Sequence, residues 1–368
     1  MDSAELLQQR LANQHISASP FKRAAQVVDW LVAVQSQDFA GAKWSLGLRI
    51  QGARDADIEQ AFNSGEILRT HILRPTWHFV MPADIRWLLA LTAPRVHARN
   101  AHYYRRAGLD NHVFKLSNDA LVKALQGGNF LTRDELRTLL QEAGLETQGE
   151  YRMNYLMMQA ELDGLICSGP RHGKQFTYAL LEERAPQAET LPYEQALARL
   201  AQRYFNSRGP ATVHDFAKWS GLTVASARQG LESVQDELGH TLQDGRPYWF
   251  PPDAGTPVKA YPQAYFLSIY DEYISSYKDL GAVASPEHAA RLVALGNALS
   301  YIMIMDGRVA GNWKRRFRKD AVHITMNLFK GLTDAEEQAL TQAAYRYGEF
   351  FELPVVLEQV NSGEKAQD

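Results

Sequence analysis

The sequence predicts an α+β protein with three tandem winged helix-turn-helix domains followed by a β-rich, barrel-like C-terminal domain. Two regions in the middle of the chain each read as short helices followed by a hairpin, which is the order of a winged helix. From about residue 259 onward, short apolar segments alternate as strands do. With 368 residues, the chain is long enough for two to four domains.

The first region, residues 1–115, reads as a looser version of the same plan. Its expected helices span about 6–12, 24–34, 55–63 and 82–106. Gln35 and Gln37 would end the second of these helices and continue its apolar faces. An unpaired amide in an apolar setting costs roughly 1–3 kcal/mol. These two amides therefore either complete a local network or face a molecule that arrives from outside.

The segment 70–80 alternates like a single strand, and Pro75 within it indicates an edge strand or a bulge. One face of this strand would carry Arg74 and His78, which are candidate contacts to a phosphate or a base. The opposite face would carry Trp77. A histidine beside a tryptophan is more often a core residue with its hydrogen bonds satisfied, so both interpretations stay open.

The second region, residues 116–190, has the clearest local signals. Thr132 with Glu135 three residues later forms a capping box that begins a helix. A second helix is expected over 151–163, followed by a hairpin with a basic tip. The third region, residues 191–258, repeats this order with helices near 193–206, 211–220 and 226–234 and wing strands at 240–242 and 248–250.

The fourth region, residues 259–368, is expected to form a small β-sheet or a barrel-like domain, with strands at 266–270, 301–305, 308–319 and 321–326 and a helix at 333–350. Its most distinctive part is the run 314–319, with five cations beside two aromatic residues. A charge run is usually a solvated face, but this one suits phosphate contact or insertion into a groove. The candidate DNA contacts in it are Trp313, Lys314, Arg315 and Arg316.

Composition and motif spacing limit the partners, cofactors and cellular location that we expect for this chain. The net charge of −3 neither requires nor excludes nucleic-acid binding, because a local basic patch can supply the field. Cys167 is the single cysteine, and the eleven histidines lack metal-site spacing, so we expect no disulfide, no metal and no cofactor. The N-terminus lacks signal-peptide features and no apolar run is long enough for a membrane span. We expect a cytoplasmic, nucleoid-associated monomer.

Four stretches together carry a resemblance to a known family. They are Leu31–Asp38, Ile67–His78, Tyr270–Lys278 and Asp306–Trp313. In this order the chain resembles the AlkZ/YcaQ-type winged-helix DNA glycosylases over nearly its whole length. The resemblance implies three tandem winged helices and a β-rich region around a DNA-sized concave surface. It also implies excision of bulky N-alkylated purines and unhooking of interstrand crosslinks in double-stranded DNA.

Within that family the catalytic motif is Q-x-Q in one branch, which implies that Gln35 and Gln37 are catalytic. The middle residue is usually apolar, and Ser36 departs from that pattern. A guanine alkylated at N7 is already cationic, so it leaves without a strong acid. An amide oxygen can orient a water toward the sugar C1′ and face developing positive charge.

No lysine is next to the motif in the sequence, so we expect a monofunctional glycosylase without lyase activity. The Asp271–Glu272 pair, read as part of a strand, would point its carboxylates to opposite faces and make a poor catalytic dyad. The alternative function is that of a DNA-binding regulator that has the fold but no chemistry.

Overall fold

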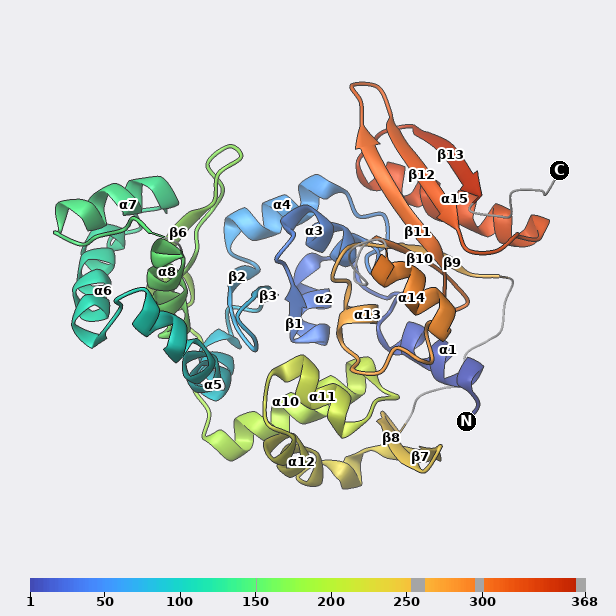
Figure 1. Cartoon of the computed structure of the whole chain (residues 1–368), viewed down its shortest axis with the longest axis horizontal. Coiled ribbons are helices and arrows are strands. Elements are labelled where there is room, and N and C mark those ends of the chain that lie inside the picture. The colour runs from blue at the N-terminus through green and yellow to red at the C-terminus, as the bar shows by residue number, and fades with distance from the viewer. Residues whose placement is uncertain (150, 253–261, 295–300, 362–368) are drawn as a thin grey trace.

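The structure is a computed structural model that describes residues 1–149, 151–252, 262–294 and 301–361. In Figure 1 the first region lies in the middle, the second region at one end and the C-terminal sheet at the other. The third region lies along the lower side of the first region in this view. Elements from distant parts of the sequence therefore meet around the first region.

The first region is built on a three-stranded antiparallel sheet with strand order β1–β3–β2. Its elements are α1 (Ser3–Asn13), α2 (Ala24–Leu31), β1 (Ala33–Gln35), α3 (Phe39–Gly47), α4 (Asp55–Ser64), β2 (Leu68–His71), β3 (Trp77–Val80) and α5 (Ile85–Arg106). The single strand predicted over 70–80 is wrong, because β2 and β3 form a hairpin there. Pro75 lies in the turn, where its missing N–H breaks no ladder, and β3 is the central strand.

The predicted helix ending in the glutamines is also wrong. The helix α2 ends at Leu31, and Val32 has a φ of +64°, a conformation that is rare for a β-branched residue. The chain then continues as β1, whose register pairs Val34 with Phe79 and Gln35 with His78. Pairing with β3 therefore overrides the helical pattern, and Gln35 is the last residue of a strand.

The second region has the order that its local signals predict. Its elements are α6 (Asn111–Leu125), β4 (Leu131–Thr132), α7 (Arg133–Glu142), α8 (Arg152–Leu162), β5 (Ile166–Ser168), β6 (Thr177–Leu180) and α9 (Leu181–Arg184). The capping box of Thr132 and Glu135 is confirmed at the start of α7. The strands form a small antiparallel sheet of order β4–β6–β5.

The third region again places helices before a two-stranded antiparallel hairpin, as predicted. Its elements are α10 (Tyr193–Arg208), α11 (Val213–Ser220), α12 (Val224–Glu232), a 3-10 turn (Gln235–Glu237), β7 (Gly239–Gln243) and β8 (Arg246–Phe250). Gly221 ends α11 with a φ of +72°, and a Cβ there would lie 2.3 Å from the backbone oxygen of Leu73. This turn therefore packs directly against the turn between β2 and β3.

The C-terminal region is an open sheet in the part of the chain that is described, so the barrel-like expectation is wrong. Its elements are β9 (Ala264–Leu267), α13 (Glu272–Ser275), α14 (Pro286–Ala294), β10 (Ile302–Met305), β11 (Arg308–Phe317), β12 (Val322–Leu328), α15 (Asp334–Phe350) and β13 (Val355–Asn361). The strand order is β13–β12–β11–β10–β9, which leaves β9 and β13 as two separate edges. The last strand, β13, runs parallel to β12.

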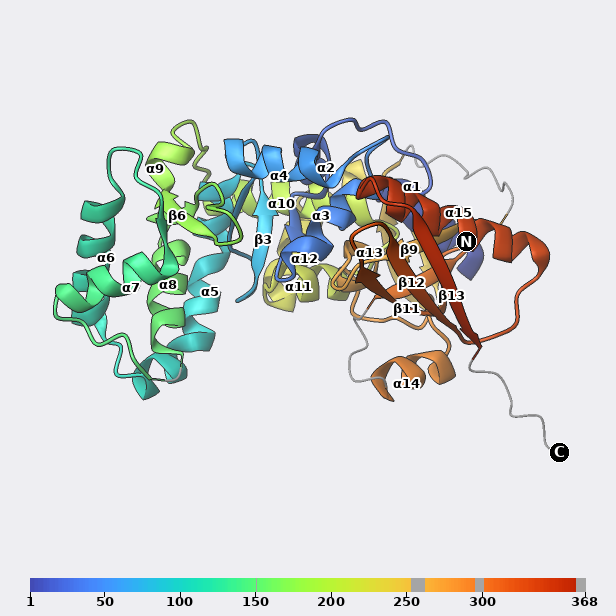
Figure 2. The same cartoon turned by 90° about the horizontal axis from the view of Figure 1, so that it is seen from above.

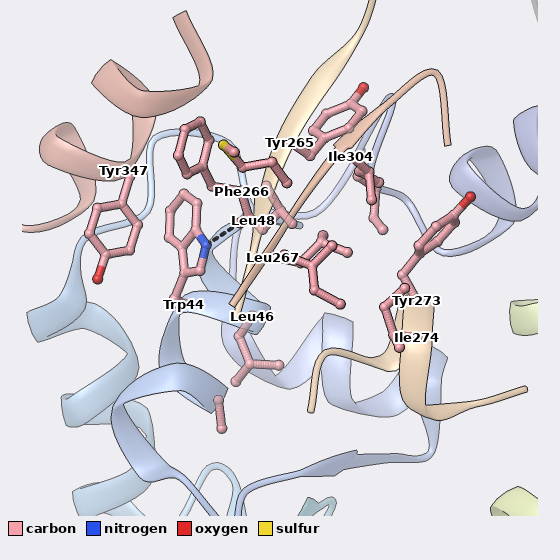
Figure 3. Packing of buried hydrophobic residues seen from close by; sticks show 14 of the residues in the cluster. Trp44, Leu46, Leu48, Tyr265, Phe266, Leu267, Tyr273, Ile274, Ile304 and Tyr347 are labelled. Carbon is pink, nitrogen blue, oxygen red and sulfur yellow. Dashed lines mark hydrogen bonds between the residues drawn. The ribbon is translucent and has the colours of Figure 1, made fainter. Parts of the chain in front are cut away.

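The hydrophobic cores do not follow the four predicted regions one for one. One cluster combines helices α1–α4 with the C-terminal sheet and α15, and a second joins β2, β3 and α5 to the third region. Figure 3 shows the first cluster, where Trp44 of α3 lies beside Tyr347 and donates to the backbone oxygen of Phe266 at 2.7 Å. The second region has a cluster of its own. This cluster also includes Tyr104 and Leu109, and α6 crosses the predicted boundary at residue 115. The division into four domains stays a prediction.

Candidate active site

Gln35 lies at the end of β1 with 9% of its surface exposed. Its side-chain Oε1 accepts a hydrogen bond from Nη2 of Arg74 at 3.0 Å. Its backbone N–H donates to Oε1 of Glu272 at 2.9 Å. The glutamine is thus fixed from both ends by charged groups. Its Nε2 has no hydrogen-bond partner among the residues that the structure describes.

Both glutamine side chains contact the segment 74–77, Gln35 through Arg74 and Gln37 through Trp77. Gln35 ends β1, whereas Gln37 lies in the bend that follows it. Ser36 is fully buried, its N–H donates to the backbone oxygen of Trp77 at 2.8 Å, and its Oγ has no partner within the described ranges. Gln37 is exposed, and its Oε1 accepts from the N–H of Trp77 at 3.3 Å. Ser36 is therefore a buried residue between two glutamines whose side chains both hydrogen-bond to the segment 74–77.

Arg74 links this loop to the third region. Its Nη1 donates to the backbone oxygen of Trp219 at 2.6 Å, while Nη2 reaches Gln35. Burial lowers the pKa of Arg74, and the negative charge of Glu272 opposes that shift. Sequence reasoning placed Arg74 at a phosphate or a base. The structure instead shows both of its Nη atoms bound to protein, in a position that orients Gln35.

Glu272 is the carboxylate beneath the site, and it is fully buried. Its Oε2 accepts from Arg208 at 2.8 Å, from Nε1 of Trp219 at 3.0 Å and from Ser276 at 2.9 Å. Burial alone would raise the pKa of Glu272, but the charge and hydrogen bond of Arg208 outweigh it and hold the pKa at about 2. The carboxylate is therefore ionised, and both of its oxygens accept hydrogen bonds from the protein.

The neighbouring Asp271 forms an ion pair with a different arginine, Arg49. It is fully buried with Arg49, and their closest N–O distance is 2.9 Å. Asp271 also caps the short helix α13 by accepting from the N–H of Tyr273. The reading of these two carboxylates as strand neighbours is thus wrong, since they begin a helix. The conclusion that they form no catalytic dyad agrees with their separate arginine partners.

His78 lies opposite Gln35 in the ladder and is completely buried. Burial, reinforced by the charge of Arg74, lowers the pKa of His78 to about 3, so the ring is neutral near pH 7. Its Nδ1 lies 2.9 Å from the backbone oxygen of Thr76, which requires the proton on Nδ1. Nε2 then faces Arg74 as an acceptor at 3.5 Å. The predicted DNA contact of His78 is therefore wrong, because its ring lies inside the protein.

Trp77 is half-buried next to the loop. The guanidinium of Arg69 lies 4.3 Å from the centre of its ring, and the ring of His71 lies at the same centroid distance. Its Nε1 donates to Glu161 at 3.2 Å. The indole is therefore held firmly beside Gln37 while part of its surface stays accessible. Trp77 remains a candidate DNA contact.

The predicted basic contacts of β11 divide between the two faces of the sheet. Trp313 is 2% exposed, packs against Tyr347 and donates to the backbone oxygen of Leu267, so its predicted DNA contact is corrected to a core role. Arg315 shares that face and lies 4.2 Å from the ring centre of Tyr301. Lys314 and Arg316 point the other way and are exposed.

Sequence reasoning missed the residues that come from distant segments: Arg208, Lys218, Trp219 and Glu272. No lysine adjoins the glutamines in the sequence, but the backbone oxygen of Lys218 lies 3.4 Å from Nη1 of Arg74. Loss of hydration around its ammonium, together with the charge of Arg74, lowers the pKa of Lys218 to about 8. The Lys218 side chain is nonetheless accessible, and its Nζ donates to the backbone oxygen of Ser275. Only the stretch 270–278, part of the resemblance, pointed toward this side of the site.

The described residues contain no group of three or more His, Cys, Asp or Glu side chains that could hold a metal ion. Cys167 is buried, and burial raises the pKa of its thiol to about 12. The thiol is thus protonated near neutral pH and is not a nucleophile. Among these residues there is also no helix that is both long and apolar enough to cross a membrane.

Comparison with known proteins decides the family. The family described as DNA glycosylase AlkZ-like matches residues 28–350. The chain belongs to the AlkZ-like DNA glycosylase family. Membership identifies it as a DNA glycosylase, a hydrolase of N-glycosyl bonds.

Two comparisons, one with a curated sequence and one with a solved structure from Streptomyces sahachiroi, agree with this assignment. A curated protein named interstrand DNA cross-link repair glycosylase is 24% identical over 321 residues, which cover 83% of this chain and 85% of the relative. The solved structure of the DNA glycosylase AlkZ from the same organism aligns with a TM-score of 0.80 and 21% identity. That alignment covers 97% of this chain and 99% of the other, so the two share one fold.

Proposed function

We propose that this AlkZ-like chain is a monofunctional glycosylase that excises N7-alkylguanine-type purines and unhooks interstrand crosslinks formed by such bases. The observation that carries the proposal is that the side-chain oxygens of Gln35 and Gln37 both accept hydrogen bonds from the segment 74–77, while Glu272 holds the backbone N–H of Gln35. The printed name of the curated relative, a crosslink repair glycosylase, supports the substrate class.

The chemistry follows from what two neutral amides can do. Each glutamine oxygen already accepts one hydrogen bond, which fixes its direction and leaves a second lone pair for an incoming water. A water held between these oxygens is oriented to attack C1′ of the sugar. The same oxygens present the negative ends of their dipoles to the oxocarbenium-like centre. The bond between C1′ and N9 breaks with its electron pair going to the cationic base, which leaves neutral, and the attacking water loses its proton to solvent. No proton is transferred to the protein.

This arrangement selects substrates by their leaving group. An amide is no general base near pH 7, and His78 is buried and neutral, so the described site offers no strong acid beside the glutamines. A neutral purine needs protonation before it leaves, whereas an N7-alkylated guanine is already cationic. We therefore infer that intact bases survive and that alkylated purines are removed.

The enzyme reaches its lesion in double-stranded DNA and acts as a monomer. Bulky adducts and crosslinks are difficult to flip into a narrow pocket. Gln37 is exposed and Trp77 is partly exposed, so both can meet the duplex directly. The hairpin of β11 and β12 contributes Lys314 and Arg316 from its exposed face, in or near the minor groove.

The deciding experiment measures release of N7-methylguanine and unhooking of a nitrogen-mustard crosslink. Wild type should release both, and Gln35→Ala combined with Gln37→Ala should remove the activity. Gln229→Ala on α12 is the matched control, because its exposed side chain makes no contact with the loop. Equal release by wild type and the double variant, or no release by either at high enzyme, would overturn the proposal. The second outcome would return the chain to the class of DNA-binding regulators.

A further inference from the structure

One face of α5 carries a row of exposed basic side chains, which we call the α5 stripe: Arg95, Arg99, His102 and Arg106. Their spacing of four, three and four residues places them on one side of an α-helix. The 22 residues of α5 include no Asp or Glu, although the whole chain has a net charge of −3. Positive charge is therefore concentrated on this helix.

The α5 stripe is not neutralised by the protein. Across the described ranges, Arg99 and Arg106 make no ion pair and no side-chain hydrogen bond. Some exposed arginines elsewhere are paired with carboxylates, for example Arg54, Arg137 and Arg199. Like charges four residues apart destabilise a helix by roughly 0.2–0.5 kcal/mol. A stripe that bears this cost without an internal partner is suited to an external anion.

The α5 stripe begins beside the candidate active site. Arg95 donates from Nε to the backbone oxygen of Gly221 at 2.6 Å, and Arg74 reaches the same turn at Trp219. The charge of Arg99 is close enough to contribute to the lowered pKa of Arg74. The end of the stripe is thus joined to the residue that holds Gln35.

The length and direction of the α5 stripe fit a DNA strand. From Arg95 to Arg106 the helix rises about 16 Å. At 3.4 Å per base pair this corresponds to about five base pairs. In Figure 2, α5 lies on one side of β3, and β11 with β12 lies on the other side. A duplex over the glutamines can therefore meet α5 with one arm and the sheet with the other.

We propose that the α5 stripe binds the backbone phosphates of the duplex arm on one side of the lesion. This inference rests on the proposed function and adds to it a fixed direction of the DNA across the protein. Its contacts are to phosphate oxygens, so they position the duplex without reading its sequence. Arm binding of this kind holds the lesion over the glutamines without any pocket for the adduct.

The test measures binding of undamaged duplex at several salt concentrations. Arg99→Glu with Arg106→Glu should weaken binding at least about tenfold and reduce the salt slope by about 1.8, since each phosphate contact contributes about 0.9. Lys22→Glu with Arg23→Glu, exposed residues before α2, makes the same charge change elsewhere. Arg99→Lys with Arg106→Lys keeps the charge and should retain most of the affinity, which separates charge from folding.

A second measurement places the contact on one arm. On a duplex that carries one N7-methylguanine at a fixed position, shortening one of the two arms below about five base pairs should weaken binding by wild type but not by the glutamate variant. Binding and salt slope equal to the Lys22 and Arg23 control, or equal sensitivity of both proteins to arm length, would overturn the proposal. The salt-slope measurement uses undamaged duplex and requires no excision, so failure of N7-methylguanine release would reject the proposed function and leave the salt-slope result standing.

Discussion

Nη2 of Arg74 donates to Oε1 of Gln35 at 3.0 Å, while Nη1 of the same guanidinium is held by the backbone oxygen of Trp219 at 2.6 Å. The orientation of the glutamine is therefore set by α11, an element of the third region. In the proposed reaction Arg74 is a positioning residue, because it would act on the reaction only through Gln35.

Replacing Arg74 by Met should reduce the single-turnover excision rate about 10- to 100-fold, which corresponds to the roughly 1.5–3 kcal/mol of a hydrogen bond to a charged group. Arg74→Lys should restore little, because an ammonium cannot bridge both partners as the planar fork does. The rate is measured with enzyme in excess over N7-methylguanine DNA. A wild-type rate in Arg74→Met, with normal thermal unfolding, would show that Gln35 needs no such anchor.

Glu272 and Arg208 should be coupled in stability. Glu272→Gln leaves the fully buried Arg208 without its carboxylate, which costs about 3–5 kcal/mol. Adding Arg208→Met removes the stranded charge, so the double variant should be more stable than the sum of the single losses predicts. Urea unfolding of the four proteins measures this difference. Strictly additive losses would mean that the pair contributes nothing as a pair.

His78 should make stability depend on pH. Its pKa is about 3 in the folded protein and 6.5 as a free side chain, so the unfolded chain binds a proton that the folded one does not. Stability is therefore full above pH 6.5 and falls as the pH drops toward 3, by at most about 1.4 kcal/mol per pH unit. His78→Gln should flatten this part of the urea-midpoint profile. The exposed control, His112→Gln, should leave it unchanged.

Lys218 should not form a covalent bond to the abasic product. Its ammonium donates to the backbone oxygen of Ser275, although its pKa of about 8 leaves a reactive fraction near neutral pH. Borohydride added during excision should trap no protein–DNA adduct. An adduct that disappears in Lys218→Arg would contradict monofunctional chemistry and identify this lysine as the nucleophile.

The two faces of β11 should differ in their effect on DNA binding. Lys314→Glu with Arg316→Glu should lower duplex affinity and reduce the salt slope by about 1.8. Arg315→Gln should change the slope by much less, because Arg315 lies over the ring of Tyr301. Fluorescence anisotropy at several salt concentrations measures both. Equal slopes in the two variants would remove the exposed face of this hairpin from the proposed DNA contacts.

The sequence was most informative where a structure depends on neighbouring residues. The capping box of Thr132 and Glu135 predicted the start of α7, because both partners lie within one turn. The end of α2 could not be predicted in this way. Its cause is the pairing of Val34 with Phe79, a contact between residues far apart in the chain, and the unusual φ of Val32.

In the candidate site, too, residues of a local motif could be predicted, whereas partners from distant segments could not. The importance of Gln35 and Gln37 was inferred from the motif, but the carboxylate under them, Glu272, comes from the other end of the chain. The predicted DNA contact of Trp313 could have been rejected from the sequence alone. Successive strand residues face opposite sides, so Trp313 and Lys314 could not both have faced DNA.

The shared core of the first and last regions has a consequence for synthesis on the ribosome. Trp44 packs against Tyr347 and Phe350 of α15, which are translated roughly 300 residues later. At about 5–20 residues per second, this part of the protein waits roughly 15 to 60 s before its core can close. The second region, which has its own cluster, can fold during that interval. The middle of the nascent chain can therefore fold before its beginning, and the core around Trp44 is completed only after α15 has been translated.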